Sequence, residues 1–130
     1  MIEYEAQDTS YPQEAQDEAM ADELSAKTCV PCRGGIPPLS ETEAKRLMEQ
    51  VPAWILSPDA HDIRRSFTFP DFKDALAFVD KVGAVAEAEG HHPEIEFGWG
   101  HCTVKTYTHK IHGLHENDFI LAAKIDKLPR

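Results

Sequence analysis

An apolar stripe at helical spacing runs from Phe72 to Ala86, and segments that alternate apolar and polar residues lie on both sides of it. The stripe follows Asp71 and stops at Gly90, so it predicts an amphipathic helix of about five turns. Phe78 lies beside the stripe and fits either core packing or a contact between subunits. A helix between two alternating regions predicts a domain that mixes helices with a sheet.

The alternating regions predict four strands arranged as two hairpins. The first hairpin joins residues 54–56 to 61–69, and the second joins 94–99 to 103–107 through a turn at 100–101. A capping box at Ser40 and Glu43 predicts a short first helix, and a last helix runs from about Glu116 to near Pro129. The predicted fold is α+β, in the order α-β-β-α-β-β-α, with a four-stranded antiparallel sheet and three helices on one face.

The N-terminal segment differs sharply from the rest of the chain. Residues 1–26 hold eight Asp or Glu and no Lys or Arg, so they carry most of the net charge of −10. We expect a disordered acidic tail over 1–28, a Cys/Gly/Pro-rich linker over 29–39 and one domain over 40–130. A short helix near 13–25 that docks on a partner is the alternative for the tail.

Charge and hydropathy also limit the partners and the location. An acidic chain is a poor match for the phosphate backbone, so we expect no nucleic-acid partner. No apolar run reaches the roughly 20 residues that span a bilayer, and the start lacks the basic region of a secretory signal. The sequence therefore predicts a soluble cytoplasmic protein without a membrane partner.

Two cysteines lie in the linker, as Cys29-Val30-Pro31-Cys32. This spacing fits half of a zinc site, a redox pair or an ordinary linker, because Cys102 is the only other thiol of the chain. A reducing cytosol would keep both thiols free.

Five of the seven histidines lie between residues 91 and 112. His91 and His92 follow the long helix, with Glu87 one turn earlier as a possible orienting carboxylate, and His109 follows the last strand. The second hairpin brings these segments to one edge of the sheet, so His91 or His92 can face His109. Facing imidazoles predict general acid–base chemistry such as a dehydration. Zinc binding is the alternative, although no H-x-x-x-H spacing occurs.

The remaining polar and aromatic candidates have structural explanations. Asp118 occupies about the third position of the last helix, where a carboxylate caps the helix, with His115 as the cap residue. His61 and His101 are expected at the surface. Trp54 and Trp99 are expected in the core or in an interface. An open sheet with free edges predicts a homo-oligomer.

The chain also resembles a known family, the pterin-4a-carbinolamine dehydratases, called dimerisation cofactors in animals. The resemblance covers about residues 29–128. It rests on a signature in order and spacing, preceded by a lead-in like that of many bacterial members: Glu87-x3-His91-His92-Pro93, Trp99, Thr108-His109, Gly113-Leu114 and Asp118, with the lead-in Cys-x-Pro-Cys-Arg-Gly-Gly-x-Pro-Pro-Leu at 29–39.

The resemblance implies a hydro-lyase that converts 4a-hydroxytetrahydrobiopterin to quinonoid dihydropterin, as a homodimer or homotetramer that serves an aromatic amino acid hydroxylase. It implies no metal and no organic cofactor. His91, His92 and His109 would be the catalytic acid and base. The implied substrate-binding residues include these three and five more: Glu87, Pro93, Thr108, Lys110 and Ile111.

Two positions depart from the family pattern. Lys110 stands where an acidic residue is common, and His112 replaces a small residue. These departures predict a more basic pocket rim, which would suit a different pterin or a substrate with a charged side chain. A non-catalytic assembly partner on the same fold is the rival function, although relatives of that kind tend to lose the histidines.

Overall fold

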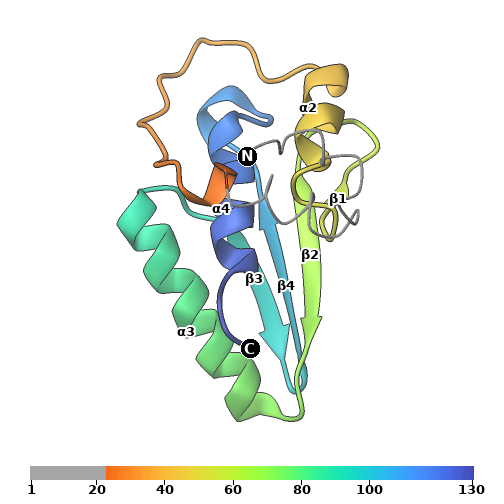
Figure 1. Cartoon of the computed structure of the whole chain (residues 1–130), viewed down its shortest axis with the longest axis vertical. Coiled ribbons are helices and arrows are strands. Elements are labelled where there is room, and N and C mark those ends of the chain that lie inside the picture. The colour runs from red at the N-terminus through yellow and green to blue at the C-terminus, as the bar shows by residue number, and fades with distance from the viewer. Residues whose placement is uncertain (1–22) are drawn as a thin grey trace, which may run out of the picture.

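The computed structural model describes residues 23–130 and contains a four-stranded antiparallel sheet (Figure 1). The sheet order is β1-β2-β4-β3, so the two predicted hairpins meet through the pairing of β2 with β4. The predicted α+β class and antiparallel pairing are confirmed. The strands are β1 (Ile55–Leu56), β2 (Ile63–Thr68), β3 (Glu94–Gly98) and β4 (His101–Thr106).

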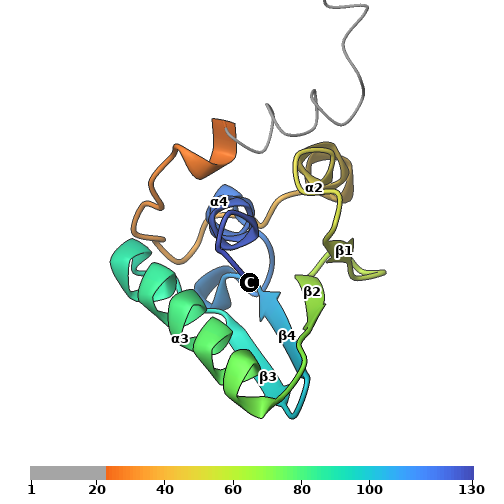
Figure 2. The same cartoon turned by 60° about the horizontal axis from the view of Figure 1, so that its bottom comes forward.

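Three helices cover one face of this sheet, as Figure 2 shows in the view from below. They are α2 (Glu41–Met48), α3 (Phe72–Glu89) and α4 (Glu116–Asp126), and a 3₁₀ turn, η2 (His109–Ile111), precedes α4. The element order agrees with the predicted order α-β-β-α-β-β-α. None of the helices described here is long and apolar enough to cross a membrane.

Local sequence signals define the helix ends as expected. Ser40 and Glu43 form the predicted capping box of α2. Asp71 caps α3, and Gly90 ends it in the left-handed conformation at φ 65°. His115 caps α4 through its ring nitrogen, which accepts from the backbone N–H of Asn117 at 3.0 Å.

The buried face of α3 lies slightly to one side of the predicted stripe. Ala75, Phe78, Val82 and Ala86 are buried, whereas Phe72 and Leu76 are 46% and 40% exposed. Phe78 packs against the Phe67 ring, with centroids 4.6 Å apart. Of the two interpretations of Phe78, core packing is therefore correct for this chain.

The open face of the sheet is polar. It carries Arg64, Ser66, Thr103, Lys105, Glu94 and Glu96, which follow from the strand register. A face of this kind needs no apolar cover, which corrects part of the reasoning for an oligomer. Ile55, opposite Arg64 on the edge strand β1, adds one exposed apolar side chain to this face. Trp99, in the turn between β3 and β4, is 70% exposed, whereas Trp54 is buried.

The chain packs against the domain well before residue 40. Residues 1–22 of the expected tail, and most of the alternative helix near 13–25, lie outside the described part of the chain. Residues 23–25 are helical, and Leu24 is buried in the core at 2% exposure. Lys124 Nζ donates to the Ser25 carbonyl at 2.9 Å. Leu24 and Ser25, which lie inside the expected tail over 1–28, therefore contact the domain.

Candidate active site

A cleft of about 360 Å³ opens where the end of α3, the end of β4 and the linker meet. The structure brings His91, His92 and His109 to this one cleft, although 18 residues separate the first from the last. The cleft is lined by three chain segments: Val30-Pro31-Cys32, Gly90-His91-His92 and Tyr107-Thr108-His109-Lys110.

His91 is held by a buried carboxylate. Its Nε2 lies 2.7 Å from Oδ1 of Asp118, which is fully buried in the first turn of α4. An ionised carboxylate only accepts, so this contact places the ring proton on Nε2. The Nδ1 atom of His91 is then the acceptor of the ring, and within residues 23–130 no hydrogen bond to it is found.

Asp118 has a larger role than the predicted helix cap. Its Oδ2 accepts from the backbone N–H of His115 at 3.0 Å, which confirms the capping box. The Thr108 hydroxyl donates to the same oxygen at 2.8 Å, and the Thr106 hydroxyl donates to Oδ1 at 2.6 Å. Four donors, counting His91, therefore converge on one buried carboxylate, which fixes it as the centre of the site.

The signal for this network was present in the last strand. Thr106 and Thr108 alternate with Lys105 and Tyr107, so both hydroxyls occupy positions that face the core. Buried hydroxyls require hydrogen-bond partners. Two inward threonines therefore indicated a buried acceptor, and the capping explanation of Asp118 used only one of its two oxygens.

Glu87, the possible orienting carboxylate, pairs with His92 and not with His91. Its Oε2 pairs with Nε2 of His92 at 2.6 Å on the exposed side of α3. The left-handed Gly90 turns the chain at the helix end, so that His91 points inward to Asp118 while His92 stays at the surface. The orienting carboxylate of His91 is therefore Asp118.

His109 lines the cleft from the 3₁₀ turn η2 that follows β4. Its side chain is 56% exposed, and its Nε2 lies 3.6 Å from Oε2 of Glu94. The Tyr107 ring meets the His109 ring edge-on with centroids 4.3 Å apart, and His61 packs on Tyr107 at 4.4 Å. Tyr107 was not among the predicted site residues, although its alternation with the inward threonines indicated that it points away from the core.

The other predicted binding residues divide into two groups. Thr108 and Lys110 line the cleft, and the Lys110 ammonium reaches the Cys32 carbonyl at 3.4 Å. Pro93 and Glu87 do not line it, and Ile111 is buried at 7% exposure. His112 also lies outside the lining, so only Lys110 contributes to the basic rim expected from the departures.

The two linker cysteines have different surroundings. Cys29 is buried, and its thiol contacts the Asn117 carbonyl at 3.5 Å. Burial, with the Glu89 carboxylate nearby, raises the pKa of Cys29 to about 12. Cys32 is partly exposed and lines the cleft. In the described part of the chain, no group of three or more His, Cys, Asp or Glu is arranged to hold a metal ion.

Comparisons with known proteins find relatives along most of this chain. The family model described as pterin 4 alpha carbinolamine dehydratase matches residues 37–128. A protein of Aromatoleum aromaticum, provisionally named a pterin-4-alpha-carbinolamine dehydratase, is 61% identical over 84% of this chain and 97% of its own. A similarly named protein of Methylococcus capsulatus is 57% identical over 81% and 92%. The crystal structure of a transcriptional coactivator/pterin dehydratase from Brucella melitensis aligns with a TM-score of 0.64 at 30% identity, covering 68% of this chain and 95% of that one.

Proposed function

The chain belongs to the pterin 4 alpha carbinolamine dehydratase family, and we propose that it removes water from 4a-hydroxytetrahydrobiopterin to give quinonoid dihydropterin. The observation that carries the proposal is the cleft that gathers His91, His92 and His109, with His91 held by Asp118. Relatives of the chain that bear the corresponding name align with it over nearly their whole length.

The dehydration moves two protons. The 4a-hydroxyl must receive a proton as its bond to carbon breaks, and the adjacent ring N–H must lose one as the new double bond forms. His91 suits the second step, because Asp118 fixes its proton on Nε2 and leaves Nδ1 as the base. His109, which lines the same cleft, is the acid that protonates the leaving hydroxyl, and His92 completes the polar lining.

The binding roles follow from the positions in and around the cleft. Thr108 and Lys110 contact the substrate directly in this proposal. Glu87 acts through His92, to which it is bonded. Pro93 and Ile111 are carried over from the resemblance as substrate contacts, although neither lines the cleft in this structure. Asp118 is a positioning residue, because it touches His91 and not the substrate.

A turnover assay with 4a-hydroxytetrahydrobiopterin tests the proposal. His91→Ala and His109→Ala should each lower kcat by about 10²- to 10⁴-fold, the usual contribution of general acid–base catalysis. His101→Ala is the matched control, since His101 is exposed and does not line the cleft. Wild-type turnover no faster than the uncatalysed reaction would instead support a non-catalytic assembly partner on this fold.

The proposal extends to the cellular setting. We place the reaction in the cytoplasm, in the recycling of tetrahydrobiopterin used by an aromatic amino acid hydroxylase. A homodimer or homotetramer is part of the proposal, supported by the exposed Phe72 and Leu76 of α3 and by Ile55 on the edge strand β1. Light scattering checks the assembly, and a monomer at micromolar concentration would contradict it.

A further inference from the structure

Part of the cleft lining comes from the linker. Val30, Pro31 and Cys32 form this wall of the cleft, although they lie before residue 37, where the match to the family model begins. Val30 is 56% exposed, and with Pro31 it forms an apolar surface in a cleft otherwise rich in histidine. A flat heteroaromatic ring needs such a surface on one side when polar groups act on its edge.

Asn117 holds this wall in place through both ends of its amide. Its Nδ2 donates to the Val30 carbonyl at 2.7 Å, and its Oδ1 accepts from the Val30 N–H at 3.1 Å. Asn117 itself is 1% exposed. The amide therefore pairs with the backbone of Val30 as a neighbouring strand would, across 87 residues of sequence.

A second contact secures the preceding residue. The Cys29 backbone N–H donates to Oε1 of Glu89 at 2.8 Å, and Lys124 lies 3.5 Å from the other oxygen of that carboxylate. The segment is thus fixed at Cys29 and Val30, immediately before the two residues that complete the wall. These contacts hold the backbone of the segment against α3 and α4, beside the cleft.

From these contacts we infer that residues 30–32 are a substrate-binding wall against which the pterin ring packs, and that Asn117 is the positioning residue for that wall. The inference rests on the proposed function, because a pterin is the ring to be bound. It separates two roles in the first turn of α4: Asp118 orients the base, and Asn117 holds the surface that binds the ring.

Asn117→Ala tests the inference through binding and kinetics together. Calorimetric titration with 7,8-dihydropterin, a stable analogue of the product, should show a Kd about 10-fold weaker, the effect of roughly one lost contact. KM should rise by a similar factor with kcat nearly unchanged, since the wall binds substrate and transition state equally. Thiol labelling reports the release of the wall, because Cys29 should become reactive in this variant.

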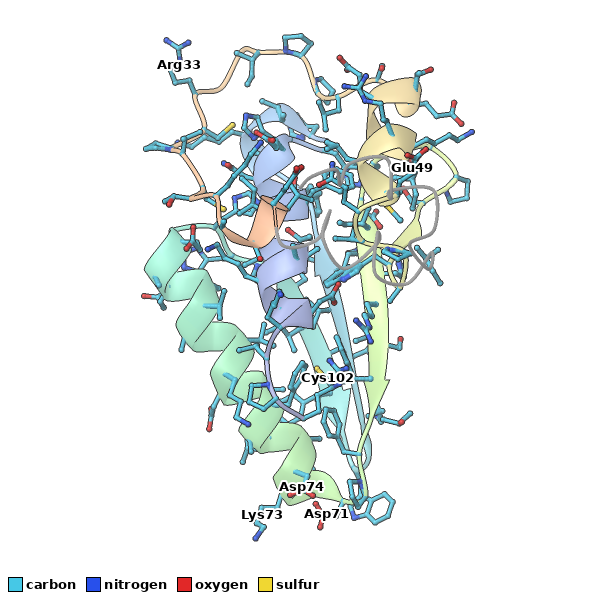
Figure 3. All side chains as sticks on the ribbon, viewed as in Figure 1. Arg33, Glu49, Asp71, Lys73, Asp74 and Cys102 are labelled. Atoms are coloured by element: carbon cyan, nitrogen blue, oxygen red, sulfur yellow. The ribbon has the colours of Figure 1, made fainter. Side chains whose placement is uncertain are left out.

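Arg33→Ala is the matched control in the same segment. Figure 3 shows Arg33 at the outer bend of the linker with its side chain pointing away from the domain, and it does not line the cleft. Its Kd, KM and thiol labelling should equal those of the wild type. If Asn117→Ala does not fold, Pro31→Gly removes apolar surface from the wall without changing a buried residue, and should weaken Kd in the same direction.

The outcomes separate this inference from the proposed function. A folded Asn117→Ala with unchanged Kd and KM would overturn the inference that residues 30–32 bind the ring. A loss of kcat alone would overturn it too. Both outcomes hold whatever the activity of the wild type. Absence of wild-type turnover with tight 7,8-dihydropterin binding would overturn the dehydratase, while weakened binding in Asn117→Ala would still support the wall. A wild type that does not bind 7,8-dihydropterin at all would contradict both.

Discussion

The Nε2 atom of His91 lies 2.7 Å from Oδ1 of Asp118, and this hydrogen bond joins the end of α3 to the first turn of α4. The two residues are 27 positions apart in the sequence. Because Asp118 is fully buried and accepts from three further donors, the imidazole is held by a group that cannot itself move freely.

Asp118→Asn should lower both activity and stability. The amide keeps the shape of the side chain but has one acceptor oxygen for four donors, so at least one buried donor loses its partner. We expect a loss of about 1–3 kcal/mol in the free energy of unfolding and a fall in kcat of about 10-fold or more. Urea unfolding measures the stability, and the turnover assay measures kcat. A folded variant with the wild-type kcat would show that Asp118 acts only as a helix cap.

The two catalytic histidines should differ in their effect on stability. His91→Ala leaves the buried Asp118 without one donor and should cost about 1–3 kcal/mol. His109→Ala removes an exposed ring, and the free energy of unfolding should stay within about 0.5 kcal/mol of the wild type. Urea titration of both variants gives the comparison, and equal stabilities would show that the His91 contact contributes little.

Only one of the three cysteines should react with iodoacetamide in the folded protein. Cys32 is partly exposed, whereas Cys29 and Cys102 are buried and burial raises the pKa of each thiol. We expect labelling of Cys32 alone at about pH 8, and of all three in urea, read by mass spectrometry of the peptides. Rapid labelling of Cys29 in the native protein would indicate that the linker is not docked.

Glu89 should make the linker contact sensitive to acid. The Cys29 backbone N–H, followed by Lys124, holds the pKa of this carboxyl below its ordinary value of 4.5. The ionised form therefore contributes stability above pH 4.5, and the contribution is lost as the pH falls through the lowered pKa. Wild type should exceed Glu89→Gln in unfolding free energy at about pH 7, and the difference should shrink in acid. A difference that does not change with pH would oppose this account.

Two glycines should respond to alanine in opposite directions. A Cβ at Gly113 would meet the Cβ of Pro38 at 2.6 Å, so Gly113→Ala must push the linker away and should cost about 1–3 kcal/mol. Gly83 lies inside α3, and apart from its own helix backbone and chain neighbours no atom lies within 4 Å of an added Cβ, so Gly83→Ala should stabilise by about 0.5–1 kcal/mol. Thermal melting of the two variants measures both changes. A Gly113→Ala variant as stable as the wild type would mean that the linker at Pro38 moves aside at little cost.

Sequence predicted the elements whose signals are local. Ser40 with Glu43, and Asp71 with Gly90, lie within or next to the helices that they define, so the helix ends were predicted closely. The buried face of α3 was harder, because two overlapping apolar rows both have helical spacing. Packing against the sheet selected the row with Phe78 and left Leu76 exposed.

Long-range pairing explains what the sequence could not show. The histidine cluster was visible as a local run, but Val30 and Asn117 are 87 residues apart, and no spacing rule connects them. The partner of Glu87 depended on a change of direction at Gly90 that turns adjacent histidines to different sides. The first of these features is a contact between remote segments, and the second depends on the backbone direction at the end of a helix.

The adjacency of Asn117 and Asp118 on one helical turn has a geometric consequence. Asp118 holds His91, and Asn117 holds Val30. A small shift of α4 therefore moves both residues together and preserves the distance between them. Movements of the rest of the domain therefore leave the distance between His91 and Val30 unchanged. Insertions elsewhere in the chain can alter the outline of the molecule without altering the spacing that a bound ring encounters.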